Sequence, residues 1–196
     1  MSAYPYPAVN YDTCPNLVSM FFDQAKRFGD KPFLWAKQDG DYRSQSWAGV
    51  LEEVRALAHG LVDFGVASGD RVVLVSENRP EWGVADLAIL AAGGITTPAY
   101  VTNTADDHAY ICDNVDAAVV IVSTAKLAGP VLDAALKTKR APKVVLLEPD
   151  GVTAPDAPHP TDGPLEIVSW AELVARGSGR EDTPSAVHGK QRQDTA

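Results

Sequence analysis

Residues 70–94 read DRVVLVSENRPEWGVADLAILAAGG, and this stretch decides the fold that we predict. It contains a continuous apolar run, Val72–Val75, which has the length of a strand and lacks the alternation of a half-exposed one. Such runs are typical of parallel strands that are buried on both faces. The residues that follow are apolar at nearly every position and end at Gly93 and Gly94, which predicts a buried helix from about Pro80 to Ala92.

The remainder of the chain alternates between strands and helices in the same way. Upstream we predict a helix over 16–29, a polar hairpin over 33–45 and a second helix over 46–65. Downstream we predict strands at 95–100, 118–122, 144–147 and 165–168, with helices at 104–111, 131–139 and 169–177. Strands that alternate with helices form right-handed β-α-β units. The sequence therefore predicts an α/β fold with a doubly wound, mostly parallel sheet and helices on both faces.

Local signals mark several of the predicted boundaries. Asp39 and Gly40 are typical of the turn in a two-residue hairpin loop. Asp107 lies three residues after Thr104, which is the spacing of a capping box at the start of a helix. Pro130 suits the first position of a helix, because its missing N–H has no partner there in any case. We therefore predict that a helix begins at this proline.

Composition divides the chain into a central body and two terminal segments. Residues 1–15 lack any hydrophobic period and are expected to form an extended arm. Residues 16–177 carry the predicted α/β subdomain. Within it, the segment 149–164 contains five prolines, which exclude a helix or an inner strand and predict a surface loop. Residues 178–196 are polar and are expected to form a tail.

Charge and cysteine content exclude several classes of function. The 17 lysine and arginine residues against 26 acidic ones give a formal charge of −9, which argues against a nucleic-acid partner. No apolar run reaches the ~20 residues of a transmembrane helix, and the N-terminus has no signal-peptide pattern. Cys14 and Cys112 form no CxxC pair and fit a reducing compartment. We expect a cytoplasmic protein, with peripheral contact at a membrane left open.

Polar residues follow the predicted strands at the edge where doubly wound sheets bind their ligands. One interpretation is that the hydroxyl side chains there cap the helices that follow, namely Ser76, Thr104, Ser123 and Ser169. The other interpretation is that this edge lines a ligand cleft. In that case, topology gives four substrate-cleft candidates: Asn78, Trp82, Tyr100 and Thr102.

Complete catalytic or metal-binding patterns are not found in the sequence. No G-x-G-x-x-G, P-loop or G-x-S-x-G motif is present. The four histidines are expected to be solvated rather than catalytic: His59, His108, His159 and His188. Cys112 is expected to be a small buried hydrophobe, and the pairs Glu52-Glu53 and Asp106-Asp107 to lie on solvated helix faces or to support helix dipoles. We therefore predict no catalytic, cofactor-binding or metal-binding residue in this chain.

Several ordered segments together resemble one enzyme family. They include GVASGDRV at 65–72, NRPEW at 78–82, ADLAILAAG at 85–93, PAYVT at 98–102, and the strand AVVIVS at 118–123. In this order they resemble the N-terminal portion of AMP-forming, or adenylate-forming, acyl-CoA synthetases. The forms at 78–82 and 98–102 look most like the long-chain fatty-acid–CoA ligase branch. The similarity covers about residues 16–170 and implies an incomplete N-terminal subdomain of the synthetase fold.

The resemblance implies a two-step reaction in the full-length enzyme. A fatty acid or other carboxylate reacts with ATP to give an acyl-adenylate, and CoA then displaces AMP, with Mg²⁺ neutralising the phosphates. The family's phosphate loop is rich in Ser, Thr and Gly, and residues 194–196 look like the approach to it. Because no residue matches that loop, ATP, CoA and Mg²⁺ are not expected to bind this chain alone. It is expected to be inactive, with the remainder of a ligase chain as its partner.

Two other interpretations remain open at this point. The chain could be a stand-alone, non-catalytic α/β module that binds a partner or complements a split ligase. It could also be an unrelated doubly wound binding protein that shares the same pattern of strands and helices.

Overall fold

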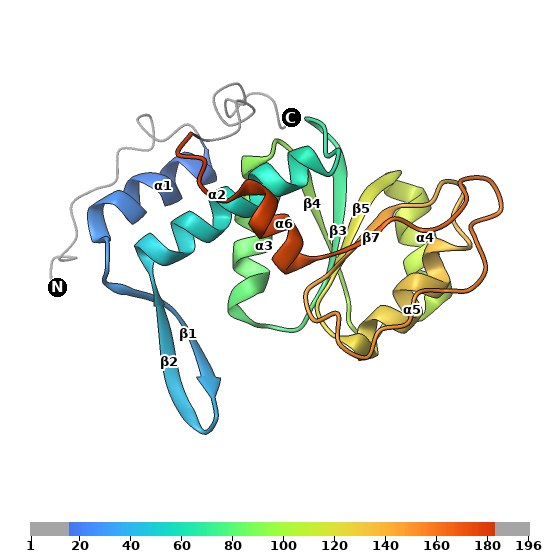
Figure 1. Ribbon diagram of the computed structural model, residues 1–196, viewed down its shortest axis with the longest axis horizontal. Coiled ribbons are helices and arrows are strands. Elements are labelled where there is room, and N and C mark those ends of the chain that lie inside the picture. Colours follow the sequence, from blue (N-terminus) through green and yellow to red (C-terminus); the bar gives the residue numbers. More distant parts are fainter. Residues whose placement is uncertain (1–15, 183–196) are drawn as a thin grey trace, which may run out of the picture.

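The computed structural model describes residues 16–182 of the chain (Figure 1). Its helices are α1 (Leu17–Phe28), α2 (Trp47–Asp63), α3 (Pro80–Ala91), α4 (Ala105–Val115), α5 (Ala125–Ala135) and α6 (Trp170–Gly177). Its strands are β1 (Pro32–Gln38), β2 (Asp41–Ser46), β3 (Arg71–Val75), β4 (Ile95–Ala99), β5 (Ala117–Val122), β6 (Lys143–Leu146) and β7 (Ile167–Ser169). The predicted extended arm and most of the polar tail lie outside the described residues.

Five of the strands form one sheet in the order β4-β3-β5-β6-β7, and all neighbouring strands are parallel. From β3 the chain first moves outward to β4 and then returns past β3 to form β5 on its other side. The order of strands therefore reverses between β3 and β5, which makes this the topological switch point of the sheet. The predicted α/β fold with a doubly wound parallel sheet is confirmed.

Helices cover both faces of this sheet, as Figure 1 shows. Alternate residues of β3 belong to different cores: Val72 and Leu74 pack with α1, α2, α3 and α6, whereas Val73 and Val75 pack with α4 and α5. All four side chains are at most 1% exposed. A strand with a helical layer on each side has no polar face, which explains why its sequence is apolar without interruption.

Helices α2 and α6 cross so closely that backbone touches backbone. A Cβ atom on Gly60 of α2 would lie less than 3.0 Å from the backbone carbonyl of Leu173. A Cβ on Gly177 of α6 would lie equally close to the carbonyl of Ala56. Glycine is required at both positions because any side chain would push the two helices apart.

Strands β1 and β2 form a separate antiparallel hairpin that projects from the rest of the structure (Figure 1). Its turn has positive φ angles at Asp39 (52°) and Gly40 (95°), as the predicted two-residue turn requires. At its base, the rings of Phe33 and Trp47 stack with centroids 3.6 Å apart. The hairpin prediction is confirmed, and the strands extend further than the sequence indicated.

The predicted start of the fifth helix is wrong. Helix α5 begins at Ala125 and encloses Pro130, which the sequence placed at its first position. A proline inside a helix removes one backbone hydrogen bond. Burial compensates for that loss, because an apolar stripe made by Leu127, Ala128, Val131 and Leu132 packs against the sheet.

Smaller boundary differences occur elsewhere. Helix α4 runs on to Val115 rather than ending near Ile111, and β7 is a three-residue strand that starts at Ile167 rather than Leu165. Residues 149–164, all of which the structure describes, form no helix and only one isolated bridge, between His159 and Gly163.

Candidate functional site

The switch point between β3 and β5 is closed by its own side chains. Ser123, which follows β5, donates a hydrogen bond to the Glu77 carboxylate that follows β3. This bond is the main reason that the pKa of Glu77 lies below its usual value, ahead of the opposing effect of desolvation. The carboxylate is therefore ionised near neutral pH. A phosphate group at this place would meet a fixed negative charge.

Arg79 forms a second set of ion pairs across the carboxyl edge of the sheet. Its Nε donates to Glu81 at 2.8 Å, and its Nη1 donates to Glu148, after β6, at 2.7 Å. These two bonds, with the bond to Glu81 the stronger contributor, hold the pKa of Arg79 above its ordinary value. The two carboxylate partners offset the positive charge of the guanidinium, which weakens its attraction for a phosphate. The carboxyl ends of β3, β5 and β6 are thus tied together.

An open groove of about 630 Å³ lies beside the closed switch point, between the ends of β3 and β4. It is lined by Ser76, Glu77, Asn78, Trp82, Pro98, Ala99, Tyr100 and Val101. Three of the four substrate-cleft candidates, Asn78, Trp82 and Tyr100, therefore come together in one groove. Thr102 is exposed and is not among the lining residues. Most of the lining is apolar or aromatic, which suits an uncharged, apolar part of a ligand better than a phosphate.

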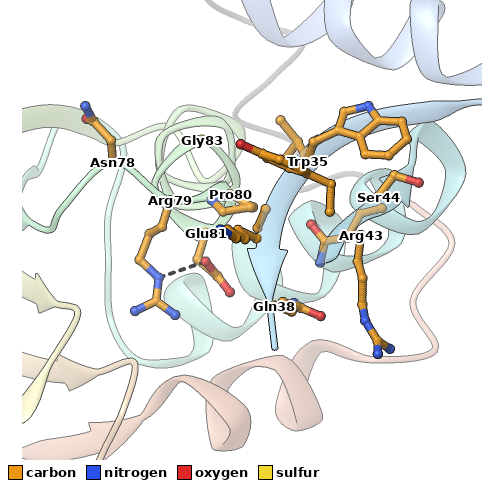
Figure 2. A pocket seen from close by; sticks show the side chains of 14 residues that line it. Trp35, Gln38, Arg43, Ser44, Asn78, Arg79, Pro80, Glu81 and Gly83 are labelled. Carbon is orange, nitrogen blue, oxygen red and sulfur yellow. Dashed lines mark hydrogen bonds and ion pairs between the residues drawn. The ribbon is translucent and has the colours of Figure 1, made fainter. Parts of the chain in front are cut away.

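A second groove of about 870 Å³ separates the hairpin from the start of α3 (Figure 2). Trp35, Arg43 and Ser44 of the hairpin lie on one side of it, and Asn78 and Glu81 lie on the other. Sequence reasoning missed this groove because its two walls are more than 30 residues apart. The only available signal was the hairpin, whose exposed aromatic Trp35 has no role in the core.

Two of the four expected helix caps are confirmed. The hydroxyls of Thr104 and Ser169 accept from the backbone of Asp107 and Glu172, and both capping boxes are complete. The prediction is wrong for Ser76 and Ser123. The helices that follow them begin later, so that Ser76 donates to the Glu77 carbonyl and Ser123 to its carboxylate.

The expectation that the histidines are solvated is wrong for each of the three that the structure describes. His59, His108 and His159 are 5%, 3% and 3% exposed, and His188 lies outside the described residues. His159 is buried because distant backbone satisfies it: its Nε2 lies 2.8 Å from the carbonyl oxygen of Thr138. Burial lowers the pKa of His108, against the smaller effect of the Asp107 charge, so that its imidazole is neutral near pH 7.

The remaining reactive side chains behave mostly as expected. Cys112 is buried, and desolvation raises the pKa of its thiol to about 11, as predicted for a small apolar core residue. Asp106 and Asp107 are exposed. Glu53 differs from expectation, because it is half-buried and accepts a hydrogen bond from Trp170 Nε1 at 3.2 Å. Burial is the main cause of its raised pKa.

Metal-ligating residues do not gather within the described part of the chain. Across residues 16–182, no group of three or more His, Cys, Asp or Glu side chains could hold a metal ion. None of the helices in this range combines the length and hydropathy that crossing a bilayer requires.

Comparison with known proteins identifies the family. The sequence model of the AMP-binding enzymes matches residues 21–188, which is most of the chain. The chain belongs to the AMP-binding enzyme family. The predicted resemblance to adenylate-forming synthetases is thereby confirmed.

Among curated members of the AMP-binding enzyme family, the long-chain-fatty-acid–CoA ligase FadD15 of Mycobacterium tuberculosis is 34% identical over 109 residues. That match covers 56% of this chain and 18% of the ligase. Protein Y of Streptomyces griseus is 33% identical over 177 residues, which are 87% of this chain and 52% of that protein. The chain thus spans less than a fifth of the ligase and about half of Protein Y.

Solved structures support the same fold. A benzoate CoA ligase from Burkholderia xenovorans LB400 superposes with a TM-score of 0.66 at 23% identity, covering 86% of this chain and 30% of that one. The A domain of a carboxylic acid reductase from Segniliparus rugosus gives a TM-score of 0.67 at 17% identity, covering 83% and 30%. The described body is therefore part of the adenylate-forming synthetase fold.

Proposed function

We propose that this chain forms the N-terminal part of an ATP-dependent, AMP-forming ligase that joins a fatty acid to CoA. The observation that carries the proposal is the family match over residues 21–188, together with the identity to a long-chain-fatty-acid–CoA ligase. In such a ligase the carboxylate oxygen attacks the α-phosphate of ATP and pyrophosphate leaves. The CoA sulfur then attacks the acyl carbon of the adenylate and AMP leaves.

The role we assign to this chain within that ligase is structural. The switch point presents the ionised Glu77, which opposes a phosphate, and the charge of Arg79 is offset by two carboxylates. Among the described residues, no cluster of three or more His, Cys, Asp or Glu side chains could hold Mg²⁺. No step of the reaction is therefore assigned to them. The chain builds one helix-covered sheet, and its partner is the remainder of the ligase. The free, buried thiol of Cys112 supports a cytoplasmic setting, in which cysteines stay reduced.

The groove between β3 and β4 is the part of this body that we assign to the acyl substrate. Trp82 is half-buried and Tyr100 is 81% exposed, so their rings form an apolar wall that is open to a ligand. Asn78 contributes a hydrogen-bonding side chain at the same groove. Thr102 remains a weaker candidate because it does not line the groove. An acyl chain would be held there by burial of its methylene groups, at roughly 0.8 kcal/mol each.

Carboxylate-dependent exchange between ATP and pyrophosphate tests the proposal. The purified chain, given hexadecanoate and Mg²⁺, should show only background exchange. A folded fusion of residues 16–182 to the remainder of a homologous long-chain ligase should show exchange that depends on the fatty acid. Turnover by the chain alone would contradict the structural role. A folded fusion without fatty-acid dependence would contradict the ligase assignment.

The same fusion tests the groove. Trp82→Ala and Tyr100→Ala should raise the KM for the fatty acid and leave the KM for ATP unchanged, because they remove apolar wall without touching phosphate. Tyr110→Ala is the matched control, since Tyr110 is a similarly exposed tyrosine (71% against 81% for Tyr100) that does not line the groove. Equal effects of the three variants would exclude a specific acyl site at this position.

A further inference from the structure

The segment that follows α6 lies against α2 and is fastened there by one arginine. Arg180 makes a two-pronged ion pair with Asp63 near the end of α2: Nη1 lies 3.2 Å from Oδ1 and Nη2 lies 2.6 Å from Oδ2. This pair is the main reason that the pKa of Asp63 is lowered. Two parallel bonds fix the plane of a guanidinium, which a single ion pair does not.

A buried histidine extends the same contact. The Nε2 atom of His59 lies 3.0 Å from the backbone carbonyl oxygen of Asp182, so this nitrogen carries the proton and donates. Its Nδ1 is then an acceptor, and Arg180 Nη1 donates to it across 3.3 Å. His59 and Asp63 are four residues apart and share one face of α2. One guanidinium therefore bridges two successive turns of this helix.

The backbone before Arg180 explains why these contacts are needed to fix the path of the chain after α6. Helix α6 packs closely on α2, with Gly177 against the backbone carbonyl of Ala56. Directly after it, Ser178 is extended and Gly179 has a φ of 79°, so the chain turns at a residue with a wide choice of conformations. Ordering such residues costs backbone entropy, and the contacts of Arg180 and His59 oppose that cost.

We infer that Arg180, together with Asp63 and His59, acts as a positioning clamp that fixes the path of residues 178–182 across α2. The clamp sets the place and direction in which the chain continues toward residue 183. In the proposed ligase it therefore places the polypeptide that follows relative to this body, a consequence that rests on the proposed function. Figure 1 shows α6 crossing α2, with the clamped segment continuing from it.

Limited proteolysis of the 196-residue chain tests the clamp without any reference to ligase activity. A glutamate-specific protease cleaves after Glu181 only when the segment leaves α2. Asp63→Ala and Arg180→Ala should each speed this cleavage by about tenfold, and the double variant should be no faster than either single one. Each rate is divided by that of a synthetic peptide with the same 176–186 sequence, which removes effects of the substitution on the protease itself.

Two internal controls keep the result specific. Cleavage after Glu53, inside α2, reports global unfolding and should not change. Glu52→Ala removes another exposed acid of α2 that forms an ion pair, with Arg55, and should leave the Glu181 rate unchanged. The inference is overturned if neither single variant accelerates cleavage, if their effects add in the double variant, or if Glu53 becomes equally sensitive.

The active fusion supplies a readout that a purely stabilising contact would not move. Asp63→Ala should raise the KM for ATP and leave that for the fatty acid unchanged, because the resemblance places the phosphate loop in the polypeptide that follows. Equal KM values for the variant and the parent fusion would remove the catalytic consequence. If the parent fusion is itself inactive, the proposed function fails, while the proteolysis rates still decide whether the clamp exists.

Discussion

Replacing Gly60 by alanine tests the close crossing of α2 and α6. In an exposed helix interior this change stabilises by about 1 kcal/mol, because alanine is the better helix former. At Gly60 the new methyl group would overlap the backbone carbonyl of Leu173, which cannot rotate away as a side chain can. Overpacking of this kind costs about 3 kcal/mol at the upper end of its usual range. The net expectation for Gly60→Ala is a loss of about 2 kcal/mol in the free energy of unfolding.

Urea denaturation followed by far-UV circular dichroism measures this loss. With an m value of about 2 kcal/mol/M, the midpoint should fall by about 1 M. Gly83→Ala is the matched control, since Gly83 lies inside α3 and an added Cβ would meet nothing within 4 Å. It should leave the midpoint unchanged or raise it slightly. A Gly60→Ala variant as stable as Gly83→Ala would refute the close approach of the two helices.

Three further outcomes follow from single side chains. Arg71→Ala removes the hydrogen bonds to Val115 and Asp116 that close the end of α4, together with one to Gly69, and should lower the free energy of unfolding by about 1–2 kcal/mol in the same urea assay. Alkylation mapped by mass spectrometry at pH 8 should leave Cys112 unmodified in the native chain and modify it in urea, because its thiol stays protonated up to about pH 11 and is buried. Glu53 has a folded pKa above its unfolded value, so its ionisation destabilises the fold as pH rises past the unfolded pKa. Glu53→Gln should therefore gain stability over the parent at pH 7 and lose that gain in acid, and an advantage independent of pH would contradict the raised pKa.

Local patterns in the sequence were sufficient for the sheet and for most helix boundaries. Strand β3 was predictable because burial on both faces demands an uninterrupted apolar run, and Val72–Val75 provides one. The turn at Asp39 and Gly40 was predictable because few residue types tolerate positive φ. The start of α5 was not predictable from Pro130. The preference of proline for the first turn of a helix contributes less stability here than burial of the apolar stripe on both sides of it.

The environments of the histidines depend on contacts between residues far apart in the sequence. His59 is satisfied by Arg180 and Asp182, more than 120 residues later, and no local pattern indicates that pairing. The groove beside the hairpin was not predicted for the same reason, because its two walls are far apart in the sequence. By contrast, three cleft candidates could be brought together from topology alone, because carboxyl ends of neighbouring parallel strands share one edge of the sheet. Their role in binding a substrate stays a prediction.

In doubly wound sheets the ligand groove usually lies at the switch point of the strand order, but in this protein the groove and the switch point are separated. The strand order reverses between β3 and β5, yet the open groove lies between β3 and β4. Glu77 and the pair of Arg79 with Glu148 occupy the switch point. Two like charges 4 Å apart repel by about 1 kcal/mol in water and about 4 kcal/mol near a protein surface, so a phosphate with several charges is disfavoured there. An apolar ligand in the adjacent groove meets no such barrier, which is why we assign this body to the acyl group rather than to the nucleotide.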